Sequence, residues 1–104
     1  MVTLQKEIIM IDGVPKPDSP FNHVIKAGGF LFLTSQLSCD LKTSKIIGGT
    51  MKEQTRRALD NVKFLLQASG SAMSDIVKVV IYMRDLSKFS DMNAVYRGYF
   101  ARAE

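Results

Sequence analysis

The segment between Thr50 and Gly70 constrains the fold more than any other part of the chain. Thr50-Met51-Lys52-Glu53 matches the S/T-x-x-E capping box, in which a hydroxyl and a carboxylate each bond a backbone amide at the helix start. Gly70 is a glycine of the kind expected just past a helix end, where the backbone adopts the left-handed conformation. Between them, apolar side chains recur at three- and four-residue intervals, at Ala58, Val62, Leu65 and Leu66. The spacing predicts a long helix with one apolar face that needs a partner layer.

Three extended segments precede this helix. Residues 3–11 end in the apolar run IIMI and lead into a loop rich in Asp, Gly and Pro. Val24 and Ile25 open a second strand, and Gly28-Gly29 predict the hairpin turn that joins it to a third, FLFLTSQL, at residues 30–37. Residues 39–49 have the composition of a loop.

After the helix, residues 76–84 alternate apolar and polar side chains, which predicts a fourth strand with one face on the core. A second helix is predicted from an apolar stripe at Phe89, Met92, Tyr96, Tyr99 and Phe100. This order predicts an α+β fold, a mixed β-sheet with two helices packed on one face. At 104 residues the chain fits a single domain spanning 1–104.

The composition is that of an ordinary globular protein, with 46% hydrophobic and 23% charged residues. No apolar run approaches the ~18 to 20 residues of a membrane-spanning helix. The first residues do not resemble a secretion signal, and the one cysteine, Cys39, cannot form an internal disulfide. We therefore expect a cytoplasmic protein in which Cys39 is structural rather than reactive.

The formal net charge is +4, and four cations lie on the predicted first helix at Lys52, Arg56, Arg57 and Lys63. Such a charge could serve an anionic partner. At helical spacing, however, these residues occupy the solvent side, and no aromatic platform interleaves with them for base stacking. A solvated face is therefore the preferred interpretation over a nucleic-acid footprint.

The sequence lacks the residue patterns of most common metal, phosphate-binding and catalytic sites. His23 is the only histidine and has no second ligand at metal spacing, which favours a hydrogen-bonded surface or edge histidine. Neither glycine pair has the spacing of a phosphate loop, and Ser35 lacks the G-x-S-x-G context of an acyl-transfer nucleophile. Polar groups next to apolar elements remain, namely Thr34-Ser35-Gln36 and Asn93. Structural hydrogen bonding and ligand binding both stay open for them, the former slightly preferred.

Two blocks carry a family resemblance. FLFLTSQLSCD resembles the pattern L-Y-V-S-G-Q-L-P-x-D, and residues 53–100, from EQTRRAL to VYRGYF, resemble E-Q-x-x-x-A-L-x-N-[LV]-x-x-x-L-x-A-x-G-x-x-x-x-D-[IV]-V-K followed by D-[LM]-x-x-F-x-x-[MV]-N-x-x-Y-x-x-[FY]-F. The likeness covers nearly everything from Pro20 to Phe100. On it, the chain is identified as a member of the Rid family, also called YjgF-like or L-PSP-like, whose fold is chorismate-mutase-like.

The resemblance implies a homotrimer with ligand clefts between subunits and hydrolysis of enamines or imines, such as 2-aminoacrylate and 2-iminopropionate, to 2-keto acids and ammonia. It implies no metal or organic cofactor. Of the substrate-binding positions, Asn93 matches the family's helix asparagine and Thr34 keeps a hydroxyl where the family has Ser. Phe21 stands where the family has Tyr, and Ser35 where it has Gly.

Two alternatives to the deaminase accompany the resemblance. The first is a non-catalytic homotrimer that binds small carboxylates or a protein partner at the interface cleft. It is favoured by Phe21, because the change from Tyr removes a hydroxyl donor. The second is the ribonuclease activity attached to the family by name, which comes last because the chain has no histidine pair for phosphodiester cleavage.

The family continues past its second helix into a P-A-R strand, whose arginine holds the substrate carboxylate, and a last strand with a glutamate associated with the catalytic water. Arg102 follows Phe100 too closely to be that arginine. No catalytic residue is therefore assigned within the 104 residues. We expect that the natural protein continues past Glu104 and that a form ending there does not deaminate measurably.

Overall fold

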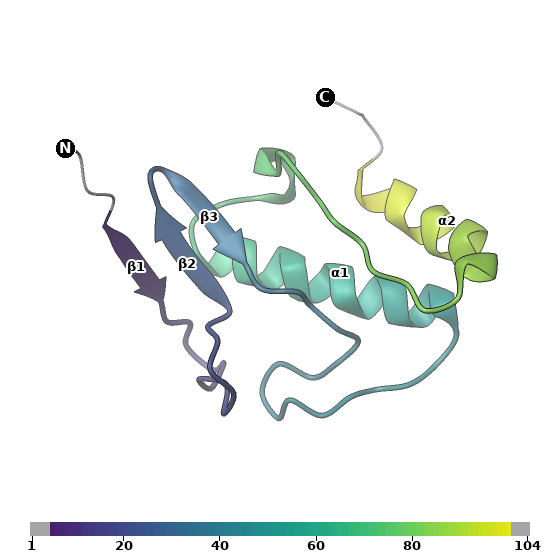
Figure 1. The fold of residues 1–104 in the computed structure, drawn as a ribbon, viewed down its shortest axis with the longest axis horizontal. Helices are drawn as coiled ribbons and strands as arrows, with labels where there is room; N and C mark the ends of the chain where they lie inside the picture. Colours follow the sequence, from purple (N-terminus) through teal and green to yellow (C-terminus); the bar gives the residue numbers. More distant parts are fainter. Residues whose placement is uncertain (1–4, 101–104) are drawn as a thin grey trace.

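The computed structural model describes residues 5–100. The chain begins with three strands, β1 (Lys6–Ile9), β2 (Val24–Ala27) and β3 (Phe30–Leu33), which form one antiparallel sheet in the order β1-β2-β3 (Figure 1). Ala27 pairs with Phe30, so Gly28 and Gly29 make a two-residue turn. Their φ angles of 58° and 81° are those of the hairpin turn predicted from the sequence. Residues 3 and 4 of the first predicted strand lie outside the described residues.

Helix α1 (Met51–Ala68) begins and ends where its sequence signals lie. The Glu53 amide donates to Thr50 Oγ1 at 3.2 Å, and the Thr50 amide donates to Glu53 Oε1 at 3.3 Å, so both halves of the capping box are formed. Gly70 has φ 82°, the left-handed conformation of a helix stop. The predicted boundaries of this helix are confirmed.

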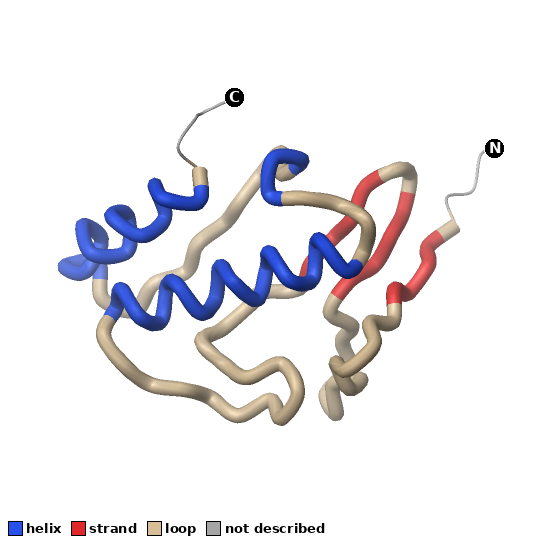
Figure 2. Tube along the Cα trace, turned by 180° about the vertical axis from the view of Figure 1, so that it is seen from behind, coloured by secondary structure: helices blue, strands red, loops and turns tan. Residues whose placement is uncertain are grey.

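The second helix, α2 (Phe89–Tyr99), follows the short 3-10 turns η1 (Met73–Asp75) and η2 (Leu86–Lys88). Helix α2 packs mainly against α1, and Figures 1 and 2 show the two helices side by side with the strands at one end of α1. The α+β class is confirmed. No helix within residues 5–100 is long and apolar enough to cross a bilayer. The buried apolar side chains are Val14, Val24, Leu59, Leu65, Leu66, Met92 and Val95.

Residues 76–84, predicted as a fourth strand, pair with no strand of the described chain. Figure 1 shows them as an unpaired trace between η1 and η2, outside the sheet. Most of their apolar side chains are open to solvent, with Val77 84% and Tyr82 85% exposed. A strand requires a neighbour for its backbone hydrogen bonds, and β3 does not lie alongside this segment. Within residues 5–100 the sheet is therefore antiparallel rather than mixed.

The apolar run of β3 predicts a strand whose apolar part is buried in the sheet core, but it is only partly buried. Leu31 and Leu33 are half-buried, whereas Phe30 and Phe32 are 56% and 61% exposed on the other face. Their rings lie 6.4 Å apart between centroids. The reason is the two-residue period of a strand, which sends alternate side chains of an unbroken apolar run to opposite faces. One face of β3 thus carries uncovered aromatic surface.

Candidate functional site

Polar and aromatic side chains gather where the β2–β3 hairpin meets its flanking loops. The Thr34 amide donates to the His23 carbonyl at 3.0 Å, which extends the strand pairing by one residue. Gln36 Nε2 donates to the Thr34 carbonyl at 3.3 Å and lies 3.4 Å from His23 Nδ1. The Phe21 ring meets the His23 ring edge-on, with centroids 5.8 Å apart. We call these four residues, Phe21, His23, Thr34 and Gln36, the strand-end corner.

His23 is the titratable group of the strand-end corner. Its side chain is half-buried, and this partial burial lowers its pKa below the ordinary histidine value. The imidazole is therefore neutral near pH 7, and Nδ1 can accept a hydrogen bond from the Gln36 amide. This is the hydrogen-bonded edge histidine predicted from the sequence.

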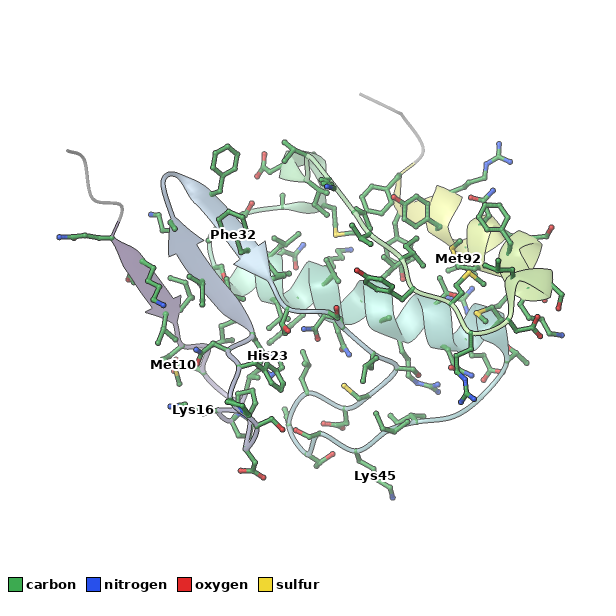
Figure 3. All side chains as sticks on the ribbon, viewed as in Figure 1. Met10, Lys16, His23, Phe32, Lys45 and Met92 are labelled. Carbon is green, nitrogen blue, oxygen red and sulfur yellow. The ribbon has the colours of Figure 1, made fainter. Side chains whose placement is uncertain are left out.

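The structure brings together only part of the predicted substrate-binding set. Phe21 and Thr34 meet through His23, and Ser35 is exposed next to Thr34. Asn93 is half-buried on α2, directly after the buried Met92. In Figure 3, Met92 and His23 lie on opposite sides of the molecule, so Asn93 does not join the strand-end corner within one chain. The assignment of all four residues to substrate stays a prediction.

Of the corner residues, His23 was not among the predicted site residues, and Gln36 was named only within the polar group Thr34-Ser35-Gln36; the sequence contains the signal that brings them together. A two-residue turn at Gly28-Gly29 pairs Ala27 with Phe30, and each further step outward pairs the next residues. Four steps out, this counting places His23 opposite Thr34. Gln36 follows two residues later, on the same face as Thr34.

The loop after the strand-end corner is tied to α1 by a side-chain amide. Asn61 Nδ2 donates to the carbonyl oxygens of Leu37 and Cys39, at 3.1 and 2.9 Å. Cys39 itself is half-buried. Among the described residues there is no group of three or more His, Cys, Asp or Glu side chains placed to hold a metal ion. Arg102 lies outside the described residues.

Comparison with known proteins identifies the family. Residues 12–104 match the family described as Endoribonuclease L-PSP. The chain belongs to this family. The resemblance to Rid proteins drawn from the sequence is thereby confirmed.

Relatives within the L-PSP family have names that differ in detail. A RutC family protein of Pyrococcus horikoshii is 42% identical over 99 residues, which are 95% of this chain and 79% of that protein. A 2-iminobutanoate/2-iminopropanoate deaminase of Dermatophagoides farinae is 30% identical over 95 residues, 91% of this chain and 74% of that protein. The crystal structure of RidA from the Antarctic bacterium Psychrobacter aligns with a TM-score of 0.82 and 26% identity, covering 93% of this chain and 78% of that one. The family therefore includes proteins named as imine deaminases.

Proposed function

We propose that this protein hydrolyses reactive enamines and imines, such as 2-aminoacrylate and its tautomer 2-iminopropionate, to 2-keto acids and ammonia. The observation that carries the proposal is the hydroxyl of Thr34 at the end of β3, set in the strand-end corner of a chain that is 30% identical to a named imine deaminase. The reaction adds water to the imine carbon, transfers a proton to nitrogen and expels ammonia. The single cysteine suits a reducing compartment, and we place the reaction in the cytoplasm.

Each group of the strand-end corner has a restricted role in this chemistry. The backbone amide of Thr34 is already bonded to His23, so Thr34 can offer only its hydroxyl. That hydroxyl can donate to a substrate carboxylate or to the developing amine, as general acid–base catalysis requires. The backbone carbonyl of His23 and the side-chain amide of Gln36 hold the backbone of Thr34 in place, and the His23 ring contacts that amide.

The proposed cleft lies between subunits of a homotrimer. Within one chain Asn93 is apart from Thr34, and a neighbouring copy would bring the two together. The exposed aromatic face of β3 and the exposed apolar side chains of residues 77–82 provide surface for such contacts. An interface of this kind would also exclude water from the imine before the positioned water attacks.

A deamination assay tests the proposal. 2-Iminopropionate is generated in situ by an amino-acid oxidase, and its loss is followed with and without protein. The resemblance implies that the arginine of the family's P-A-R strand holds the substrate carboxylate. The assay therefore compares the 104-residue chain with a version extended by that strand and the family's last strand. We expect acceleration by the extended form.

Variants of Thr34 identify the group responsible. In the extended form, Thr34→Ser keeps the hydroxyl and should keep most of the activity, whereas Thr34→Val removes a donor in the same volume and should lower kcat by about 10²-fold. Equal activity of the valine and serine variants would show that the Thr34 hydroxyl takes no part in the reaction. An inactive extended form that still binds 2-keto acids would instead support the non-catalytic binding protein, which Phe21, lacking a hydroxyl at the strand-end corner, favours.

A further inference from the structure

A groove of about 580 Å³ lies between α1 and α2, and its residues differ from those of the strand-end corner. Helix α1 supplies three cationic side chains to the lining, Lys52, Arg56 and Lys63. All three are exposed. The sequence alone favoured a solvated face for these cations, and the packing of α2 against α1 turns that face into one wall of a groove.

The three cations form a stripe because of their helical spacing. Residues at i, i+4 and i+11 lie within an arc of about 40° on an α-helix. Lys52 and Arg56 are one turn apart, about 6 Å along the axis, and Lys63 lies about 10 Å further on. Arg57, by contrast, donates to the Gly48 carbonyl at 3.1 Å and is not part of the lining.

One carboxylate contacts the lining of the groove and is already hydrogen-bonded. Asp60 accepts a hydrogen bond from the hydroxyl of Tyr99, which lines the groove from α2. Among the described residues of the lining, the charged side chains are the three cations, and the carboxylate of Asp60 beside Tyr99 offsets one of these charges. Such a wall attracts an anion with more than one negative charge.

The opposite wall leaves room for the rest of a ligand. It is built from Ala94, Val95 and Gly98 of α2, of which Val95 is buried and forms an apolar floor. A Cβ added at Gly98 would meet nothing within 4 Å. Small side chains thus hold the groove open along α2.

We propose that this groove binds a phosphorylated small molecule of nucleotide size. Two cations one turn apart, one of them an arginine with its forked donors, suit a diphosphate. The volume lies within the range of small-molecule sites. Among the described residues Tyr99 is the one aromatic side chain in the lining, whereas single-stranded RNA is normally held on a series of stacking aromatics.

Calorimetric titration of adenosine 5′-diphosphate into the 104-residue chain at low salt tests the proposal. We expect one site per chain with a Kd in the micromolar range. Arg56→Gln should weaken binding about tenfold, since it removes the forked donor. Lys45→Gln removes the same charge from the loop that Figure 3 shows away from α2, and should leave Kd within about twofold.

A second pair of variants tests the groove itself. Gly98→Glu places a carboxylate in the open space and should abolish binding, whereas Gly98→Ala fills little of it and should bind as the unaltered chain does. Circular dichroism checks that each variant is folded. Equal weakening by Arg56→Gln and Lys45→Gln, or undiminished binding by Gly98→Glu, would overturn the proposal. So would a short RNA that binds while the diphosphate does not, because that result would indicate a nucleic-acid surface.

Discussion

Tyr99 connects the two helices through its hydroxyl, which donates to Asp60 on α1 and approaches the Arg56 carbonyl at 3.4 Å. Partial burial, together with the hydrogen bond to Asp60 and its negative charge, raises the pKa of Tyr99 to about 12. The hydroxyl can donate only while it is protonated. This contact between the helices is therefore lost at strongly alkaline pH, where the hydroxyl ionises.

The pH dependence has a defined sign. Because folding raises the pKa of Tyr99 from 10.0 to about 12, its stabilisation is complete below pH 10 and is lost as the pH rises towards 12. In urea unfolding at pH 8, the free energy of unfolding of Tyr99→Phe should be lower than that of the natural sequence by about 1 kcal/mol or less. The difference should shrink above pH 10. If the two proteins keep the same difference from pH 8 to 12, Tyr99 does not make this contact in solution.

At the scale of elements, both ends of α1 depend on a residue suited to its position, a capping hydroxyl at Thr50 and a glycine with positive φ at Gly70. Replacement of Thr50 by Ala removes the hydroxyl that accepts from the Glu53 amide, at a cost of about 1 kcal/mol. Hydrogen bonds from Thr50, first from its backbone and then from its side chain, lower the pKa of Glu53. Their contribution is present above the ordinary glutamate pKa of 4.5 and is lost as the pH falls through the lowered value. Thermal melts of Thr50→Ala should therefore lie below those of the natural sequence at every pH, because the bond from the Glu53 amide does not titrate, and the gap should narrow in acid, where the bond from the Thr50 hydroxyl to the Glu53 carboxylate weakens. A gap that does not narrow between pH 7 and pH 2 would contradict the part assigned to the carboxylate.

Gly70 and Gly98 offer a matched comparison of glycines. Both have open space where a Cβ would lie, but Gly70 has φ 82°, whereas no positive φ is found at Gly98, which lies within α2. Gly70→Ala should destabilise the protein by about 1 kcal/mol through backbone strain. Gly98→Ala should stabilise it by about 0.5 to 1 kcal/mol through helix propensity. Denaturant unfolding at pH 7 measures both, and effects of the same sign would refute the backbone explanation.

At the scale of the whole molecule, the uncovered apolar surface is the feature that a single chain leaves unexplained. Phe30 and Phe32 on β3 and Val77 and Tyr82 in the extended segment are each more than half exposed. Exposed apolar side chains that gather on one element are typical of a surface that contacts a partner. The proposed homotrimer provides a cover for it, and its closed symmetry limits further association.

Sedimentation equilibrium tests this assembly. We expect three chain masses at micromolar concentration for the natural sequence and for Lys45→Glu, an exposed change on a loop. Phe32→Glu places a charge on the aromatic face and should shift the protein to the monomer, because a buried unpaired carboxylate is costly. A monomer for the natural sequence would contradict the trimer, and an unaltered trimer of Phe32→Glu would exclude this face from the interface.

The sequence by itself determined the features whose causes lie within a few residues of each other. The capping box at Thr50, the left-handed stop at Gly70 and the turn at Gly28-Gly29 were predicted correctly, because each depends on local backbone conformation and nearby hydrogen bonds. The pairing of His23 with Thr34 was also contained in the sequence, through the register that the turn imposes.

Only the tertiary structure decided the features that depend on distant segments. Residues 76–84 have the alternation of a strand, but a strand also needs a neighbour, and none lies beside them in the described chain. Three of the four cations of α1 lie on the solvent-exposed face that their spacing predicts, and they line a groove because α2 packs next to that face. In both cases periodicity specifies which side chains share a face, whereas the partner of that face is set by long-range packing, which a local pattern does not contain.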